Sequence, residues 1–189
     1  FYEAMRQDGT VSFVEPRAGG AEFHVHHLPG VMDVETMRSV PVRLRGSRNT
    51  RTVAITGLPS DPQLNRVASR DGHAESLPAE GLVLSKMLGD ILGVQAGDEI
   101  RVEVLEGSRP VREMTVAGLV DDTLGLQAYL RLDAVHRLLR EGETITGAAV
   151  TIDPAVVRQF YSDVKTMPAV AGVALRETTL QNFRETMAE

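Results

Sequence analysis

The order of apolar and polar positions predicts a helix, a turn and a strand in the middle of the chain. Between Gly81 and Gly107, apolar residues first recur at helical spacing and then alternate with charged residues. The helical set is Leu82, Leu84, Leu88, Ile91 and Leu92, and the alternating set is Ile100, Val102 and Val104. Gly93 is placed to end the helix in a left-handed conformation, and Gly97-Asp98 to turn the chain into the strand. We interpret this junction as architectural.

The two ends of the chain carry a similar pattern. "FVEP" at 13–16 is followed by "LPGVMDV" at 28–34, and "TIDP" at 151–154 is followed by "MPAVAGV" at 167–173. In each copy a β-branched run ends in acid-proline, and an apolar-Pro-small-Val signature follows about a dozen residues later. The offset between the copies is nearly constant, which indicates two βαβ-like halves.

Each half predicts a strand, a helix and a second strand. Proline after an acidic residue suits the first turn of a helix, and Asp153 is a plausible N-cap. The expected elements are strand 10–14, helix 19–28 and strand region 31–55 in the first half, and helix 155–166 and strand 170–175 in the second. The helix 155–166 carries one apolar stripe, made of Val156, Val157, Phe160, Tyr161 and Val164. We expect one buried sheet under Phe160 that contains Val14, Ile152, Val170 and Val173.

The fold class that follows is α+β. Two βαβ units in one sheet form a ferredoxin-like, split βαβ layer with helices on one face. Between the halves, short strands are expected at 99–105, 111–120 and 127–131, and a helix at 132–140 leads back. The expected division is 1–57 for the first half of the layer, 58–131 for an inserted β-rich subdomain, and 132–189 for the second half. We expect the insert to swing on hinges near Gly57–Pro59 and Arg131–Leu132, and to present its loops 60–77 and 121–127 to a partner.

Composition narrows the function. The chain has a net charge of −6 and few aromatic residues, so a nucleic-acid-binding surface is not expected. Its basic cluster alternates with Val and Leu and is interpreted as a solvated strand face, with a phosphate or lipid-headgroup site as the alternative; it consists of Arg38, Arg43, Arg45, Arg48 and Arg51. The absence of cysteine excludes disulfides and thiolate chemistry. The longest segments without charged residues, 23–32 and 166–175, are too short to span a bilayer. The abrupt ends suggest a piece of a longer protein.

Candidate chemistry is weak throughout the chain. His24, His26 and His27 are the best candidates for a metal site, but no third ligand lies at a motif spacing. Asp121-Asp122 could form a carboxylate pair, although an acid-rich turn is the simpler interpretation, as it is for Asp71-Gly72-His73. There is no nucleophile elbow, phosphate loop or dinucleotide fingerprint. We therefore expect no catalytic, cofactor-binding or metal-binding residues, and no enzyme.

Taken in order, several motifs resemble one family. "LPGVMDVETMRSVPVRLR", "ITGLP", "LPAEGLVLSKMLGDILGVQAGDEIRVEVLEG", "VAGLVDDTLGLQAYLRLDAVHRLL" and "MPAVAGV" together resemble the extracytoplasmic domain of an ABC-transporter permease. The type is that of the macrolide exporter MacB, the lipoprotein-release permeases and FtsX. The likeness covers nearly the whole chain.

The resemblance implies a non-catalytic domain outside the inner membrane, between two membrane helices, with a porter-like layer and a small β-rich insert. It implies a cytoplasmic ABC ATPase as partner, a second permease copy or paralogue, and a periplasmic adaptor or a lipid or lipoprotein cargo. The domain would couple ATPase-driven helix motion to export, extraction or activation of a partner. A ligand- or partner-sensing binding module is the alternative. A cofactor-binding enzyme fragment is a third, because similar Gly-Asp junctions occur in cofactor-binding β-barrels.

Overall fold

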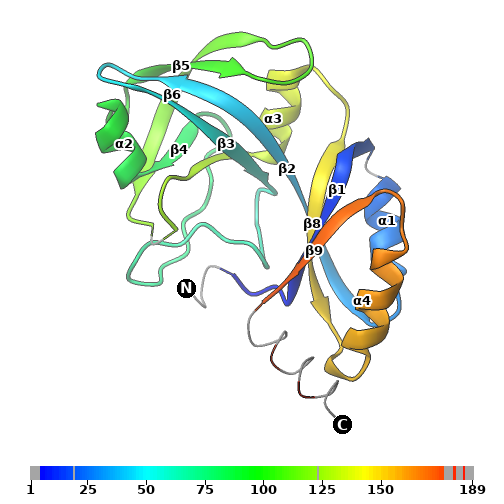
Figure 1. Ribbon diagram of the computed structural model, residues 1–189. Coiled ribbons are helices and arrows are strands. Elements are labelled where there is room, and N and C mark those ends of the chain that lie inside the picture. Colours follow the sequence, from blue (N-terminus) through cyan, green and yellow to red (C-terminus); the bar gives the residue numbers. More distant parts are fainter. Residues whose placement is uncertain (1–4, 19, 123, 177–180, 182–184, 186–189) are drawn as a thin grey trace.

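The computed structural model describes residues 5–18, 20–122, 124–176, 181 and 185. They form a four-stranded layer with two helices and a six-stranded barrel with two more (Figure 1). One long strand, β2 (Val31–Arg45), runs through both units, its first half in the layer and its second half in the barrel. The α+β class expected from the sequence is confirmed. No helix in the described part of the chain has the length and apolar character needed to cross a membrane.

The layer is an antiparallel sheet in the order β2-β8-β1-β9. Its other strands are β1 (Gly9–Ala18), β8 (Thr144–Ile152) and β9 (Val170–Leu175). The crossovers are α1 (Gly20–His26), from β1 to β2, and α4 (Val157–Lys165), from β8 to β9 after a short 3₁₀ turn, η1 (Pro154–Val156). Both helices cover the same face of the layer (Figure 1).

The layer has its own apolar core between the sheet and these helices. Phe160 and Val164 of α4 are fully buried there. The strands contribute apolar residues such as Val11 of β1 and Ile152 of β8. Val170 and Val173 pack against this core, as expected from the sequence.

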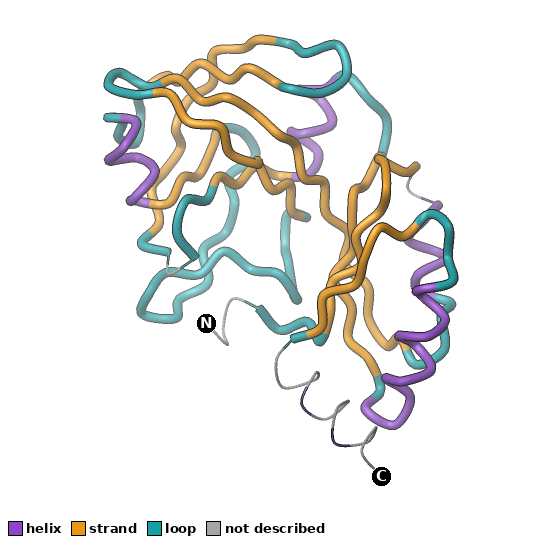
Figure 2. Tube along the Cα trace, viewed as in Figure 1, coloured by secondary structure: helices purple, strands orange, loops and turns teal. Residues whose placement is uncertain are grey.

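The barrel closes through six neighbouring pairs, in the order β2-β3-β7-β4-β6-β5-β2. Its remaining elements are β3 (Thr50–Leu58), β4 (Leu82–Ser85), α2 (Lys86–Leu92), β5 (Glu99–Val104), β6 (Val111–Val120), β7 (Ala128–Arg131) and α3 (Leu132–Leu139). Its core is filled by Val, Leu and Ile from these strands together with residues of both helices. The tube view in Figure 2 shows the strands of the barrel set apart from those of the layer.

Three local expectations are wrong. The helix expected from Leu82 begins only at Lys86, because 82–85 is a fully buried strand whose apolar run looks the same in either conformation. The strand expected at 10–14 is longer than predicted, since β1 continues through Pro16 to Ala18. Val14 is 64% exposed, because it points to the face of the layer that carries no helices. The left-handed cap at Gly93, with φ 71°, is as expected.

The passage between layer and barrel lies elsewhere than the sequence suggested. The division expected from the sequence assigns the second half of β2 and nearly all of β3 to the layer. In the structure, both pair within the barrel. Gly57 pairs with Leu130, and a Cβ there would meet Val135 of α3 at 2.8 Å, so this position is packed rather than hinged. The chain instead passes between the units at 37–38 within β2 and at 140–144 before β8. This geometry contradicts hinges at Gly57–Pro59 and Arg131–Leu132.

Candidate functional site

A buried arginine holds the junction of the layer and the barrel. The side chain of Arg38 is 2% exposed and lies where β2 enters the barrel. Its Nε donates to Glu141 Oε1 at 2.8 Å, and its Nη2 donates to Glu141 Oε2 at 3.1 Å and to Glu106. Its Nη1 donates to the carbonyl oxygen of Ser39. Glu106 follows β5 and Glu141 precedes β8, so one guanidinium joins three segments.

The charges of this network support one another. Burial lowers the pKa of Arg38, but the two carboxylates outweigh it and raise the pKa above its ordinary value. Burial likewise raises the pKa of Glu141, but the hydrogen bonds and charge of Arg38 outweigh it and hold that pKa below the usual glutamate value. Arg38 and Glu141 are therefore both charged at neutral pH, and with the contact to Glu106 the junction forms an ion-paired clamp.

A second contact ties the layer to the long loop that follows β3. Glu35 of β2 accepts hydrogen bonds from the backbone amides of Gln63, Leu64 and Asn65. The amide of Arg6, just before β1, donates to the carbonyl of Leu64 at 2.8 Å. The layer and the barrel side of the molecule are thus connected by the continuous strand, the Arg38 network and this carboxylate.

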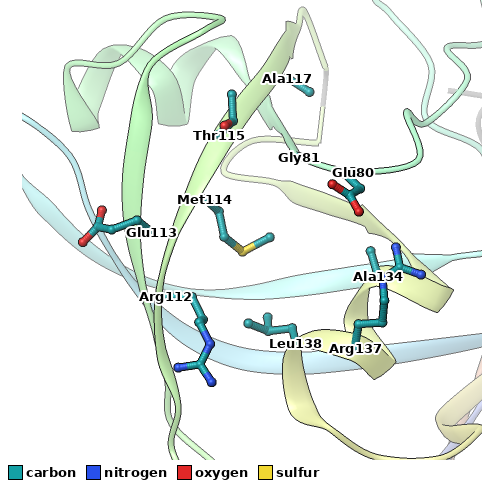
Figure 3. Close-up of a pocket in the computed structure, with 10 residues that line it drawn as sticks. All are labelled: Glu80, Gly81, Arg112, Glu113, Met114, Thr115, Ala117, Ala134, Arg137 and Leu138. Atoms are coloured by element: carbon teal, nitrogen blue, oxygen red, sulfur yellow. The ribbon is translucent and has the colours of Figure 1, made fainter.

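A groove of about 580 Å³ lies in the wall of the barrel, between β6 and α3. Arg112, Glu113, Met114, Thr115 and Ala117 line it from β6, and Ala134, Arg137 and Leu138 line it from α3. Glu80 and Gly81 lie where the chain enters β4. In Figure 3, Met114 projects toward α3, whereas the carboxylate of Glu113 points away from it. The groove combines an apolar floor with a rim of acidic and basic side chains.

The histidines suggested as metal ligands lie at the exposed surface of the layer. His24 and His27 each donate through Nδ1 to a backbone carbonyl four residues earlier, at 3.0 and 2.7 Å. The ring of His27 also stacks on Phe23, with centroids 3.8 Å apart. Among the described residues, no group of three or more His, Asp or Glu side chains is arranged to hold a metal ion.

Asp121 and Asp122 lie just after β6 and have separate partners. Asp122 accepts from the Tyr129 hydroxyl and from the backbone amide of Leu124, each at 2.6 Å. Asp121 pairs with Arg70 at 3.5 Å. Burial, with the neighbouring carboxylate, raises the pKa of Tyr129, so its hydroxyl stays protonated as a donor. The hydrogen bond between Tyr129 and Asp122 therefore fixes the loop after β6. Asp71 lies in a turn, at Gly72 with φ 88°.

Sequence reasoning missed the importance of Arg38, which it grouped with the exposed basic cluster. The position of Arg38 along β2 does indicate that its side chain is buried. Val40, Val42 and Leu44 are fully buried, and Arg38 has the same parity, which places it on the core side of the strand. Arg43, at the opposite parity, is 45% exposed and pairs with Glu103. The groove could not have been expected, because it depends on where β4 begins beside β6.

The fold defined by this layer and barrel is that of extracytoplasmic domains of ABC-type transporters. Two solved structures match nearly the whole chain. The extracellular domain of the noncanonic ABC-type transporter YknZ from Gram-positive bacteria is 10% identical, with a TM-score of 0.55 over 90% of this chain and 100% of that one. The periplasmic region of MacB from Actinobacillus actinomycetemcomitans is 12% identical, with a TM-score of 0.54 over 97% and 95%. No protein-family model matches the chain, and no curated protein matches it by sequence.

Proposed function

We propose that this chain is the non-catalytic extracytoplasmic domain of an ABC-transporter permease. The observation that carries the proposal is the likeness of fold, which extends over the layer and the barrel together and involves two transporters of this class. In this role the chain binds no cofactor and performs no chemistry. ATP hydrolysis belongs to a cytoplasmic ATPase, and the domain converts the motion of the membrane helices into work outside the membrane.

The connections between the two units suit this role. The first and last strands, β1 and β9, both belong to the ferredoxin-like, porter-like layer, and we infer that force from the membrane enters there (Figure 1). β2 is one continuous strand from layer to barrel, and the salt bridges of Arg38 brace the point where it crosses. We infer that the barrel follows the layer as a coupled body, and that export, lipid or lipoprotein extraction, or activation of a partner is its output. A second permease copy and a periplasmic adaptor or cargo are the expected partners.

A labelling experiment in cells tests the location. These 189 residues contain no cysteine, so once any cysteine elsewhere in the full-length protein is replaced by serine, a single cysteine can be placed at Phe23, which is 63% exposed. In the full-length protein, a maleimide that cannot cross membranes should label Phe23→Cys in intact spheroplasts as completely as in lysed cells. Val102→Cys, at a fully buried position, is the matched control and should stay unlabelled in both. Labelling of Phe23→Cys only after lysis would place the domain in the cytoplasm and contradict the proposal.

A further inference from the structure

The groove between β6 and α3 has an unpaired strand edge along one side. β6 pairs with β5 along one edge over 111–115, but on its other edge β4 begins only opposite Val116. No strand in the described part of the chain pairs with β6 between Val111 and Thr115 on that second edge. The chain before β4 turns away at Gly81, whose φ is +89°.

The backbone groups of this edge point into the groove. In an antiparallel pair, residues alternate between those that bond the partner strand and those that point away from it. The amide of Val104 donates to Pro110 and that of Val116 donates to Asp98, so the even-numbered residues of β6 bond β5. Glu113 and Thr115 therefore direct their amides and carbonyls to the opposite side. The carbonyl of Thr115 confirms this direction, since it lies 3.1 Å from where a Cβ of Gly81 would stand.

We propose that this groove binds an extended peptide segment of a partner protein, which adds a strand to the edge of β6 beneath α3. Main-chain hydrogen bonds to the amide and carbonyl of Glu113 and to the amide of Thr115 provide affinity, since the carbonyl of Thr115 faces the start of β4. Apolar side chains of the peptide contact Met114 and Leu138. The stretch 112–115, at about 3.3 Å per residue, offers an edge of roughly 10–13 Å, enough for about four ligand residues. This inference does not depend on the transport function.

The charge and shape of the groove favour a peptide over other ligands. The charged side chains that border the groove are Glu80, Arg112 and Arg137, and because Arg137 is engaged elsewhere, they leave no excess charge that would select an anion. Arg137 is already directed to Asp133 at 3.4 Å and to the carbonyl of Ala79. The volume lies within the range of ligand sites, but the open donors and acceptors are spaced as in a strand, which a small molecule or lipid tail does not match.

Selection from a phage library of random twelve-residue peptides on the immobilised 189-residue protein tests this inference. We expect recovered peptides with alternating apolar residues, and amide exchange with the synthetic peptide should slow at Glu113 and Thr115. Failure to recover any binder, or protection confined to another surface, would overturn the proposal. The proposal would also be overturned if light scattering showed that the chain self-associates and that a second copy fills the groove.

Two substitutions at one position separate the backbone from the side chain. Glu113→Pro removes the amide that faces the groove without removing a bond to β5, whereas Glu113→Ala removes the carboxylate alone. Affinity should fall at least tenfold in Glu113→Pro and change less than threefold in Glu113→Ala, with both folds checked by circular dichroism. Equal affinity in the two variants would contradict strand addition. If Glu113→Pro does not fold, slowed amide exchange at Glu113 and Thr115 of the unaltered protein with the peptide bound decides for or against strand addition.

Discussion

At the scale of single residues, Arg38 is the side chain on which the junction depends most. It is the largest fully buried side chain among the described residues, and its charge is balanced by Glu106 and Glu141, which are 30% and 21% exposed. A buried ion pair does not by itself stabilise a fold, but removal of one partner leaves the others without compensation. Because Arg38 lies between the layer and the barrel, substitutions in this network test how firmly the two units are joined.

Arg38→Met should destabilise the protein by about 3 kcal/mol, because it leaves two neighbouring carboxylates without their cation. This is the lower end of the range for buried pairs, since both glutamates keep contact with water. Arg43→Met, the same substitution on the same strand, breaks an exposed pair with Glu103 and should cost less than about 1 kcal/mol. Urea unfolding measures both. Equal losses would show that Arg38 is not part of an essential network.

The same network predicts how stability depends on pH. The folded pKa of Glu141 is held below its ordinary value of 4.5, so its contribution to stability is complete above that pH. As the pH falls from 4.5 through the folded pKa, the unfolded state takes up the proton first and this contribution is lost. The urea concentration at the unfolding midpoint, measured between pH 3 and 7, should therefore fall less steeply with decreasing pH in Glu141→Gln than in the unaltered protein. An unchanged slope would mean that Glu141 does not contribute.

At the scale of elements, α4 covers the core of the layer through Phe160. Phe160→Ala removes a fully buried ring and should cost about 3–5 kcal/mol in the free energy of unfolding. Phe23→Ala, on the exposed side of α1, should change stability by less than about 0.5 kcal/mol. Thermal or urea unfolding compares the two. A small effect of Phe160→Ala would mean that α4 does not pack as described.

The elements also show how far the sequence predicts the fold. Strands β5 and β6 and the helices α3 and α4 follow from alternation and periodicity, because each has one buried and one exposed face. β4 was not predicted, since a strand buried on both faces has no alternation to detect. The closure of the barrel through β2 could not be predicted either, because nothing in the local pattern shows that one strand serves two sheets.

The candidate site was predicted less well than the fold. The sequence correctly indicated that Asp71-Gly72 forms a turn, because the turn chemistry of Asp and Gly is local. It did not indicate the Arg38 network or the groove. Both bring together segments far apart in the chain, such as Glu106 with Glu141 and β6 with α3, and only the three-dimensional arrangement reveals them.

At the scale of the whole molecule, layer and barrel have separate cores but share a strand. The apolar clusters of the two units are distinct, which suits units that fold around their own interiors. The continuous β2, the Arg38 network and the Glu35 contact to 63–65 join them. In the proposed role, a domain built in this way would transmit a displacement of its layer to the barrel without a hinge between them. Rigid coupling of layer and barrel is thus central to the proposed role in a transporter.

Distances between spin labels test that claim most directly. In the full-length protein assembled with the ATPase that the proposed function requires, labels at Met87→Cys, which is exposed on α2 of the barrel, report the separation of two copies. A second sample with labels at Met87 and Phe23 of one copy reports the distance from barrel to layer. Trapping the ATPase with ATP and vanadate should shift the separation between copies and leave the distance within one copy unchanged. An unchanged separation between copies, or a changed distance within one, would contradict the account.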